Sequence, residues 1–139
     1  MSRPAYSAGV KGGPQVKSLI FQLSGLTLIA FANALTFKAR MPERGKVIGC
    51  TMNATAKGGT HSTSTIDVRK DATSLLVAAF DLFAHTPGTP IDKEGSALAA
   101  AADVVAKDSE IRIVTVESGG TSPTVQGLVI QVDYVPLGD

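Results

Sequence analysis

The chain has 139 residues, with 13 Lys or Arg and 12 Asp or Glu, so its formal net charge is +1. A chain of this length fits one domain that buries a core without disulfides or structural metals. The balanced charge gives no reason to expect a nucleic-acid-binding surface. Trp is absent and aromatic residues make up 5% of the chain, which argues against a stacking platform for sugars or bases.

Residues 1–16 contain no helical or strand periodicity and no apolar run of the kind found in a secretory signal. They are interrupted by five residues that prevent regular structure, namely Pro4, Gly9, Gly12, Gly13 and Pro14. We therefore expect an N-terminal arm over residues 1–16, disordered alone or extended along a partner surface. Residues 17–139 are expected to form a single domain.

Residues 18–37 carry no charge over 20 positions, which is the length of a membrane span. Within this segment, Ser24-Gly25 and Ala32-Asn33 are typical of turns. The segment is therefore predicted to form buried or interface-forming strands, and no membrane partner is expected. The first three strands are predicted near residues 17–23, 26–31 and 34–40.

The middle of the chain is predicted to hold three further strands. Pro42 and Gly45 mark a turn before a strand over residues 46–53, and residues 56–61 form a Gly-containing stretch that predicts a flexible loop. Over residues 64–70, apolar and polar side chains alternate, as in a strand with one face in a core and one in water. A tight hairpin turn is predicted at residues 70–73, followed by a short strand over Ser74–Val77.

The segment from residue 78 to residue 107 has a weaker pattern. Phe80, Leu82 and Phe83 suggest a short strand or a helical turn, and residues 86–90 form a loop. The Ala-rich stretch Ser96–Ala102 has helical propensity, but it fits equally well as a strand in an all-β chain. The choice between helix and strand stays open at this point.

The C-terminal part of the chain predicts two long strands. Residues 109–117 alternate in the manner of residues 64–70, residues 118–123 form a loop, and residues 125–135 form the last strand. One-sided strands of this kind occur in antiparallel sheets. About eight strands at this spacing predict an all-β fold, an antiparallel, jelly-roll-like β-sandwich with an extended N-terminal arm.

Candidate reactive residues are few. Cys50 is the single cysteine, lies in an apolar run and is expected to be a buried hydrophobe. His61 and His85 lack metal-binding spacing and are expected to be exposed loop residues. We therefore expect no metal, cofactor or catalytic site, so the chain is not expected to be an enzyme. Sequence spacing does not test for a pair of carboxylates contributed by distant strands.

The region from Pro42 to Tyr134 resembles the head decoration (cement) proteins of tailed phages and related β-sandwich modules on fibres. The motifs that carry the resemblance are Pro42-x-x-Gly45-Lys46-Val47-Ile48, Ser64-Thr65-Ile66-Asp67-Val68-x-Lys70-Asp71-x-Thr73-Ser74, Asp108-Ser109-Glu110-Ile111-Arg112-Ile113 and Leu128-Val129-Ile130-Gln131-Val132-Asp133-Tyr134. Ala72 stands where such hairpins usually have Gly, and Ser109 follows Asp108 where a Gly-Asp pair is typical. Residues 1–40 are not covered.

The resemblance implies a viral structural protein, a jelly-roll homotrimer on the outside of a phage head. It would bind the major capsid protein and stabilise contacts between capsid subunits in the virion, after synthesis in the host cytoplasm. Capsid or subunit contacts are expected from the arm and its junction with the domain, at Arg3, Tyr6, Val10, Lys11 and Lys17. Direct contact with nucleic acid is not expected.

The alternative is a fibre, receptor-recognition or carbohydrate-recognition module, since a sandwich does not fix a function. Such a module is expected to expose aromatic side chains in its loops. Tyr6 and Phe80 are poor candidates for that role.

Overall fold

The computed structural model describes residues 15–25, 29–32 and 35–138, which form twelve strands and two 3-10 helices. One sheet has the order β1 (Lys17–Gln22), β12 (Val129–Pro136), β4 (Gly45–Asn53), β9 (Ile91–Glu94). A second has the order β3 (Thr36–Arg40), β10 (Glu110–Ser118), β6 (Thr63–Lys70), β7 (Thr73–Ser74), with β8 (Phe80–Asp81) also on β6. A small third sheet has the order β2 (Ile29–Ala30), β11 (Thr121–Gln126), β5 (Ala56–Thr60).

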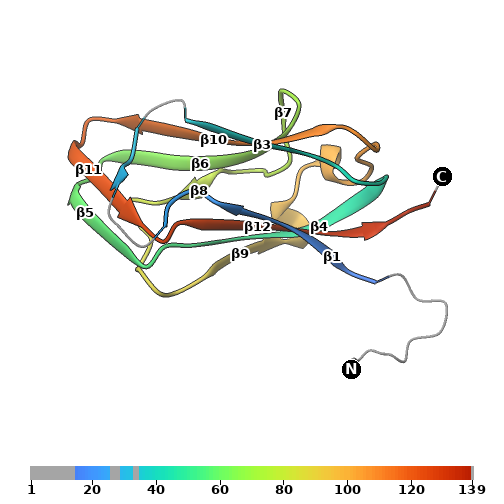
Figure 1. The fold of residues 1–139 in the computed structure, drawn as a ribbon, viewed down its shortest axis with the longest axis horizontal. Helices are drawn as coiled ribbons and strands as arrows, with labels where there is room; N and C mark the ends of the chain where they lie inside the picture. Colours follow the sequence, from blue (N-terminus) through green and yellow to red (C-terminus); the bar gives the residue numbers. More distant parts are fainter. Residues whose placement is uncertain (1–14, 26–28, 33–34, 139) are drawn as a thin grey trace.

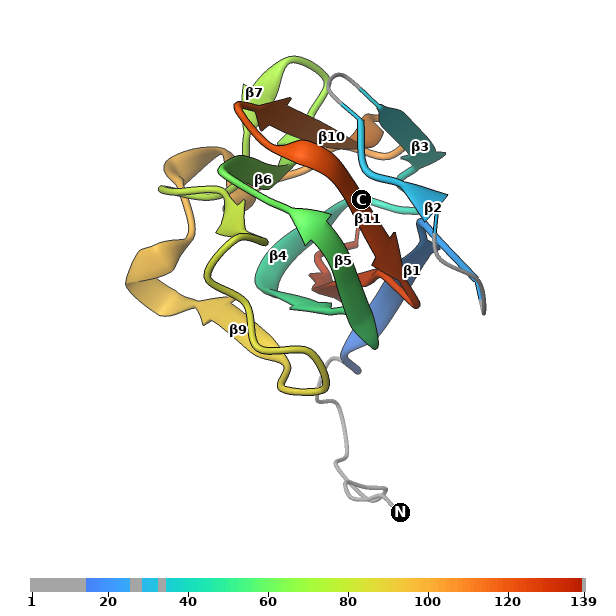
Figure 2. The same cartoon turned by 90° about the vertical axis from the view of Figure 1, so that its left-hand side faces the viewer.

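Three long segments of the chain run side by side through all three sheets, and β7, β8 and β9 add to the margins of the two main sheets. The segments 17–40 and 45–70 each pass from the first sheet, through the small sheet, into the second, and the segment 110–136 returns between them. Every pairing is antiparallel. Figure 1 shows the two main sheets as layers joined through β2, β5 and β11, and Figure 2 looks onto this joined end. The predicted all-β antiparallel sandwich is confirmed, while residues 1–14 of the predicted arm lie outside the described residues.

Alternation along the strands places one face of each main sheet in the core. In β6, Ile66 and Val68 are fully buried, while Asp67 and Arg69 are half-buried. In β10, Ile111 is likewise fully buried on the core face. Side chains in a strand point alternately to its two faces, so this spacing alone sets which residues pack. The largest fully buried side chains are Phe80, Met41, Met52, Ile66, Leu75, Leu82, Ile111, Ile113, Leu128 and Ile130.

Cys50 belongs to this core. It lies on β4 with 1% of its surface exposed, as the sequence predicted. Burial, followed by the nearby charges of Asp133 and Asp67, raises the pKa of its thiol to about 12. The thiol is therefore held in the protonated form, which is a poor nucleophile.

Two predictions around the small sheet are wrong. Residues 56–60 form strand β5 because β11 pairs with them, at Val125↔Lys57 and Thr124↔Gly58. The predicted strand 125–135 is divided at Gly127, which has φ +63° and separates β11 from β12. The predicted loop 118–123 is correspondingly shorter, because β11 already begins at Thr121.

The segment Ser96–Ala102 is neither an α-helix nor a strand. It contains the 3-10 helices η1 (Gly95–Ala97) and η2 (Ala100–Ala102), and Leu98 between them bridges to Leu76. Tertiary pairing thus overrides the helical propensity of a short alanine run. No helix in the described part of the chain is long and apolar enough to cross a membrane.

Other predicted elements are confirmed with shorter bounds. Lys70 pairs with Thr73 across a tight turn in which Asp71 has φ +53°, but the strand predicted over Ser74–Val77 ends at Ser74. Phe80 begins the two-residue strand β8. Of the predicted strands 26–31 and 34–40, residues 29–30 and 36–40 form β2 and β3, and residues 26–28 and 33–34 lie outside the described ranges.

Candidate functional site

The arm residues proposed to make contacts, Arg3, Tyr6, Val10 and Lys11, lie outside the described residues. Lys17 is described and begins β1. Its Nζ atom lies 2.6 Å from Oε2 of Glu43, which belongs to the turn between β3 and β4. The hydrogen bond to Glu43 raises the pKa of Lys17, and the same bond lowers the pKa of Glu43. The Tyr134 hydroxyl donates to the same carboxylate oxygen at 3.3 Å.

Exposed aliphatic side chains surround the point at which the arm joins the domain. Val16 is 57% exposed, Val104 46% and Leu137 40%. Three backbone contacts place them at the end of the sandwich that holds the turn 41–45: Lys17 pairs with Tyr134, Val105 with Gly45, and Leu137 N donates to Arg44 O. Sequence reasoning missed this group because its members are isolated apolar residues at element ends, without periodicity.

A second apolar group lies along the margin of the other main sheet. Val77 is 70% exposed and follows β7, and Phe83 is 55% exposed and follows β8. Asp81 accepts a hydrogen bond from Phe83 N at 3.0 Å and so fixes the turn that presents the ring. Phe80, which the sequence analysis considered as a recognition residue, is fully buried.

The predicted exposure of both histidines is wrong. His85 is 3% exposed, and its Nε2 lies 2.8 Å from Thr89 O. The ring therefore lies on the inner side of the loop 86–90 and holds it in place. His61 is 8% exposed and lies at the fold between β5 and β6, where its ring centroid is 6.0 Å from that of Phe31. The ring of His61 contacts segments distant in sequence, which no local pattern reveals, whereas that of His85 contacts its own loop.

His61 belongs to a buried polar cluster that joins the small sheet to β6 and β10. Its Nε2 lies 3.1 Å from Thr124 O, and its Nδ1 lies 2.9 Å from Ser64 Oγ. Ser64 Oγ donates to a Glu117 carboxylate oxygen in a very short bond, and the other oxygen accepts from Gly120 N at 3.1 Å. The cluster ties together two of the chain segments that turn at this corner, 45–70 and 110–136.

The order of these contacts is not that of a hydrolytic site. In a catalytic triad the histidine lies between the serine and the acid, whereas here Ser64 lies between His61 and Glu117. Ser64 is also fully buried. Ser64 donates its one hydroxyl proton to Glu117, so its oxygen accepts from Nδ1 of His61. The Thr124 carbonyl can only accept, so it accepts from Nε2 of His61. These three bonds therefore form together when both ring nitrogens of His61 donate. This arrangement suits a structural clamp at the corner.

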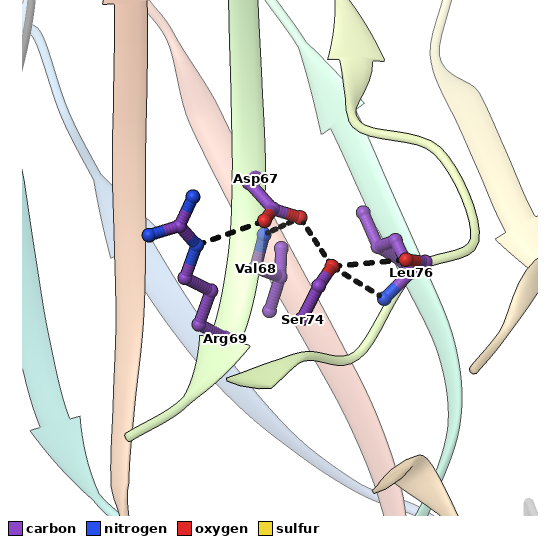
Figure 3. Close-up of polar contacts among 5 residues, drawn as sticks. All are labelled: Asp67, Val68, Arg69, Ser74 and Leu76. Atoms are coloured by element: carbon purple, nitrogen blue, oxygen red, sulfur yellow. Dashed lines mark hydrogen bonds and ion pairs between the residues drawn. The ribbon is translucent and has the colours of Figure 1, made fainter. Parts of the chain in front are cut away.

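The hairpin motif of the sequence, Asp67 to Ser74, forms a second polar cluster (Figure 3). Asp67 accepts bonds from Val68 N at 3.0 Å, from Arg69 Nε at 2.9 Å and from Ser74 Oγ at 2.7 Å. The Ser74 Oγ atom also lies 2.9 Å from Leu76 O and 3.2 Å from Leu76 N. The motif residues therefore hold the β6–β7 hairpin and the chain that leaves it, which is a structural role.

The described residues offer little for ligand chemistry. A cleft of about 380 Å³ lies between the start of β4 and residues 95–103, and its only charged lining residues are Lys46 and Asp103. Nowhere in ranges 15–25, 29–32 and 35–138 do three or more His, Cys, Asp or Glu side chains come together in a way that would hold a metal ion. Asp92 accepts a bond from Thr51 Oγ1 at 2.7 Å.

Comparison with known proteins gives remote structural likenesses only. No family model and no curated protein matches the chain. The VP2 subviral particle of infectious bursal disease virus aligns with a TM-score of 0.35 and 15% identity, over 89% of this chain and 38% of VP2. A mutant VP2 in derived T=1 particles of the same virus aligns with a TM-score of 0.33 and 17% identity, over 87% and 36%. The chain thus spans less than two-fifths of the proteins that it matches.

Proposed function

We propose that this chain is a viral structural protein that decorates a phage head, binding the major capsid protein and stabilising contacts between capsid subunits from the outer surface. In this role it acts as a homotrimer and performs no catalysis. The sequence resemblance over residues 42–134 motivates the proposal. The observation that carries it is the group of exposed aliphatic side chains, Val16, Val104 and Leu137, at the end where the arm begins.

This end of the sandwich has the properties of an assembly contact. Aliphatic side chains that are about half exposed in a single chain gain free energy when a neighbour covers them. Two of the charged groups beside them already have partners, since Lys17 pairs with Glu43 and Arg44 Nη1 donates to Gly138 O at 3.2 Å. A subunit that docks here therefore buries apolar surface without separating the Lys17–Glu43 pair.

The test compares the full chain with a variant that lacks residues 2–16, by co-sedimentation with capsids built from the major capsid protein. The truncated protein should keep the β-type circular dichroism spectrum and bind capsids more weakly, because Arg3, Tyr6, Val10 and Lys11 are lost. Equal binding and equal capsid stabilisation by both proteins would remove the arm from the proposal.

Point substitutions separate the domain surface from the arm. Val104→Ser with Leu137→Ser should weaken capsid binding on the order of tenfold to thirtyfold, at about 1 kcal/mol for each half-exposed aliphatic side chain. Val77→Ser is the matched control, because Val77 is 70% exposed but lies at the other apolar group. A larger loss from the control than from the double variant would contradict the proposed contact. Sedimentation equilibrium should give about three times the chain mass of 14.3 kDa.

One observation favours the second candidate, a recognition module on a fibre. Phe83 presents an aromatic ring that is 55% exposed from a turn fixed by Asp81. Exposed aromatic side chains are common in recognition surfaces. Loss of receptor or glycan binding in Phe83→Ala, with capsid binding unchanged, would support this candidate over decoration.

A further inference from the structure

β1 forms one margin of the sheet β1-β12-β4-β9, so it has a hydrogen-bonded neighbour on one side only. Leu23 N donates to Leu128 O at 2.8 Å, and the same antiparallel register continues with Phe21 opposite Ile130. Bonded pairs alternate along an antiparallel ladder. The peptide groups of Phe21 and of every second residue before it therefore point toward β12.

The intervening residues are Ser18, Ile20 and Gln22, and their peptide N–H and C=O groups point away from the sheet. Within the described ranges, no other strand pairs with β1 on this side. The side chains of these three residues lie on the outer face of the sheet, and Ile20 is 67% exposed. Figure 2 shows β1 at the margin of the sandwich.

The other marginal strands are protected in ways that β1 is not. β9 has the sequence Ile-Asp-Lys-Glu and β3 the sequence Thr-Phe-Lys-Ala-Arg, so both carry charges along the edge, while β2, β7 and β8 have two residues each. β5 contains Lys57, whose Nζ donates to Leu82 O and Phe83 O, so the chain that follows β8 lies beside it. Charged side chains and short strands are the usual means of preventing edge-to-edge pairing. β1 is six residues long, and its single charge, Lys17, is at the first position and paired with Glu43.

We propose that the free edge of β1 is an interface for a second copy of this chain, whose β1 pairs antiparallel with it about a two-fold axis at Ile20. In this register Ile20 faces Ile20 of the other copy, and Ser18 faces Gln22. The outward-pointing peptide groups of the two copies then lie opposite one another. They form three bonded residue pairs (18 with 22, 20 with 20 and 22 with 18), and two bonds in each pair give about six hydrogen bonds. The edge is self-complementary because no charged residue faces a like charge across the axis.

The contact between the two β1 edges is small, and its size determines the protein concentration at which it forms. Each hydrogen bond replaces one to water and contributes little net free energy, and association costs translational and rotational freedom. The contact is therefore weak in dilute solution and forms when copies are held side by side at high local concentration. It is separate from the apolar group of Val16, Val104 and Leu137 proposed above as an assembly contact, and it joins a chain of one trimer to a chain of the next.

Cysteine cross-linking tests the axis directly. Residues in a bonded antiparallel pair have Cα atoms about 5.5 Å apart, within the range that a disulfide spans. With oxidised glutathione at high protein concentration, Ile20→Cys should form a covalent dimer about tenfold faster than Val77→Cys, whose parent residue is equally exposed, at 70% against 67%. Equal rates would overturn the proposal. The native Cys50 is 1% exposed and gives no background.

A mixture of Ser18→Cys and Gln22→Cys proteins tests the register. The mixed dimer should form in preference to either homodimer, because residue 18 faces residue 22 across the axis. A statistical ratio of the three dimers would contradict this register. Addition of Ile20→Pro to both proteins should abolish cross-linking, since proline removes an outward N–H and leaves every bond to β12 in place. Unchanged cross-linking in the folded Ile20→Pro proteins would also overturn the proposal.

Amide hydrogen exchange provides a readout that does not depend on any substitution. The amides of Ser18, Ile20 and Gln22 should exchange more slowly as the concentration of the wild-type protein rises, while those of the charged edge strand β9 should not change. Exchange that is independent of concentration up to the millimolar range would exclude a second copy as the occupant. Protection that appears only when capsids are added, with no Ile20→Cys dimer formed on those capsids, would instead assign the edge to a strand of the capsid protein.

Discussion

Ser74 Oγ donates a hydrogen bond of 2.7 Å to Asp67 Oδ1 and so connects the two strands of the β6–β7 hairpin. Asp67 lies in the alternating strand and Ser74 just beyond the tight turn at Asp71. This bond explains why an acidic residue and a hydroxyl residue, seven positions apart, occur on either side of the turn. It also provides the clearest target for measuring how the hairpin is stabilised.

Asp67→Ala should lower the free energy of unfolding by about 1.5–3 kcal/mol, because it removes an acceptor of three bonds, two of them from neutral donors and one from Arg69. Ser74→Ala should cost less, about 1 kcal/mol. Urea denaturation of both single variants and the double variant measures the coupling between them. Additive losses would mean that the bond contributes nothing of its own.

Gly127→Ala should destabilise the corner between β11 and β12. A Cβ at this position would lie 2.2 Å from Thr55 Oγ1, and φ is +63°. Gly88→Ala is the matched control, because Gly88 has φ +85° and no atom within 4 Å of the added Cβ. The control should show only the cost of the backbone conformation, about 1–2 kcal/mol. Thermal unfolding of both variants should therefore give a larger loss for Gly127→Ala, and equal losses would show that the contact with Thr55 is relaxed easily.

The Lys17–Glu43 pair should contribute to stability only while both groups are charged. The pKa of Glu43 is lowered in the folded chain. The stability that Glu43 contributes is therefore present above its unfolded pKa and is lost as the pH falls through its folded pKa. Since the pKa of Lys17 is raised, its contribution is lost as the pH rises through that folded value. The stability difference between wild type and Glu43→Gln should therefore shrink at both extremes, as measured by denaturation across pH.

Nuclear magnetic resonance provides the control for this pH dependence. The pKa of the Glu43 carboxyl should rise toward its ordinary value in Lys17→Met, because the hydrogen bond that lowers it is removed. An unchanged titration of Glu43 would show that the ion pair does not form in solution.

The Cys50 thiol should be inert in the folded protein. With its pKa raised to about 12 and 1% of its surface exposed, it should react with a thiol reagent such as DTNB only through unfolding. Reaction at neutral pH should become fast in denaturant, and destabilising variants such as Gly127→Ala should speed it in proportion to their loss of stability. Rapid reaction of the native wild type would place Cys50 at the surface.

The sequence by itself determined the architecture, since alternation along one strand needs no knowledge of its neighbours. The spacing of Ile66 and Val68 assigns one face of β6 to the core wherever the strand lies. The turn at Asp71 likewise depends on residues adjacent in the chain, and the burial of Cys50 follows from its apolar run. These features are local, and the structure confirms them.

Only the tertiary structure decided the corners, because they depend on segments far apart in the chain. β11 approaches β5 closely at Gly59, where an added Cβ would lie 2.0 Å from Ser122 O. This close approach requires a glycine at position 59, and it is not visible in the sequence. His61 is buried because Phe31, Ser64 and Thr124 surround it. The position of β1 at the margin of its sheet was also hidden from sequence reasoning, since a strand with a single charge has the same composition whether it has one neighbour or two.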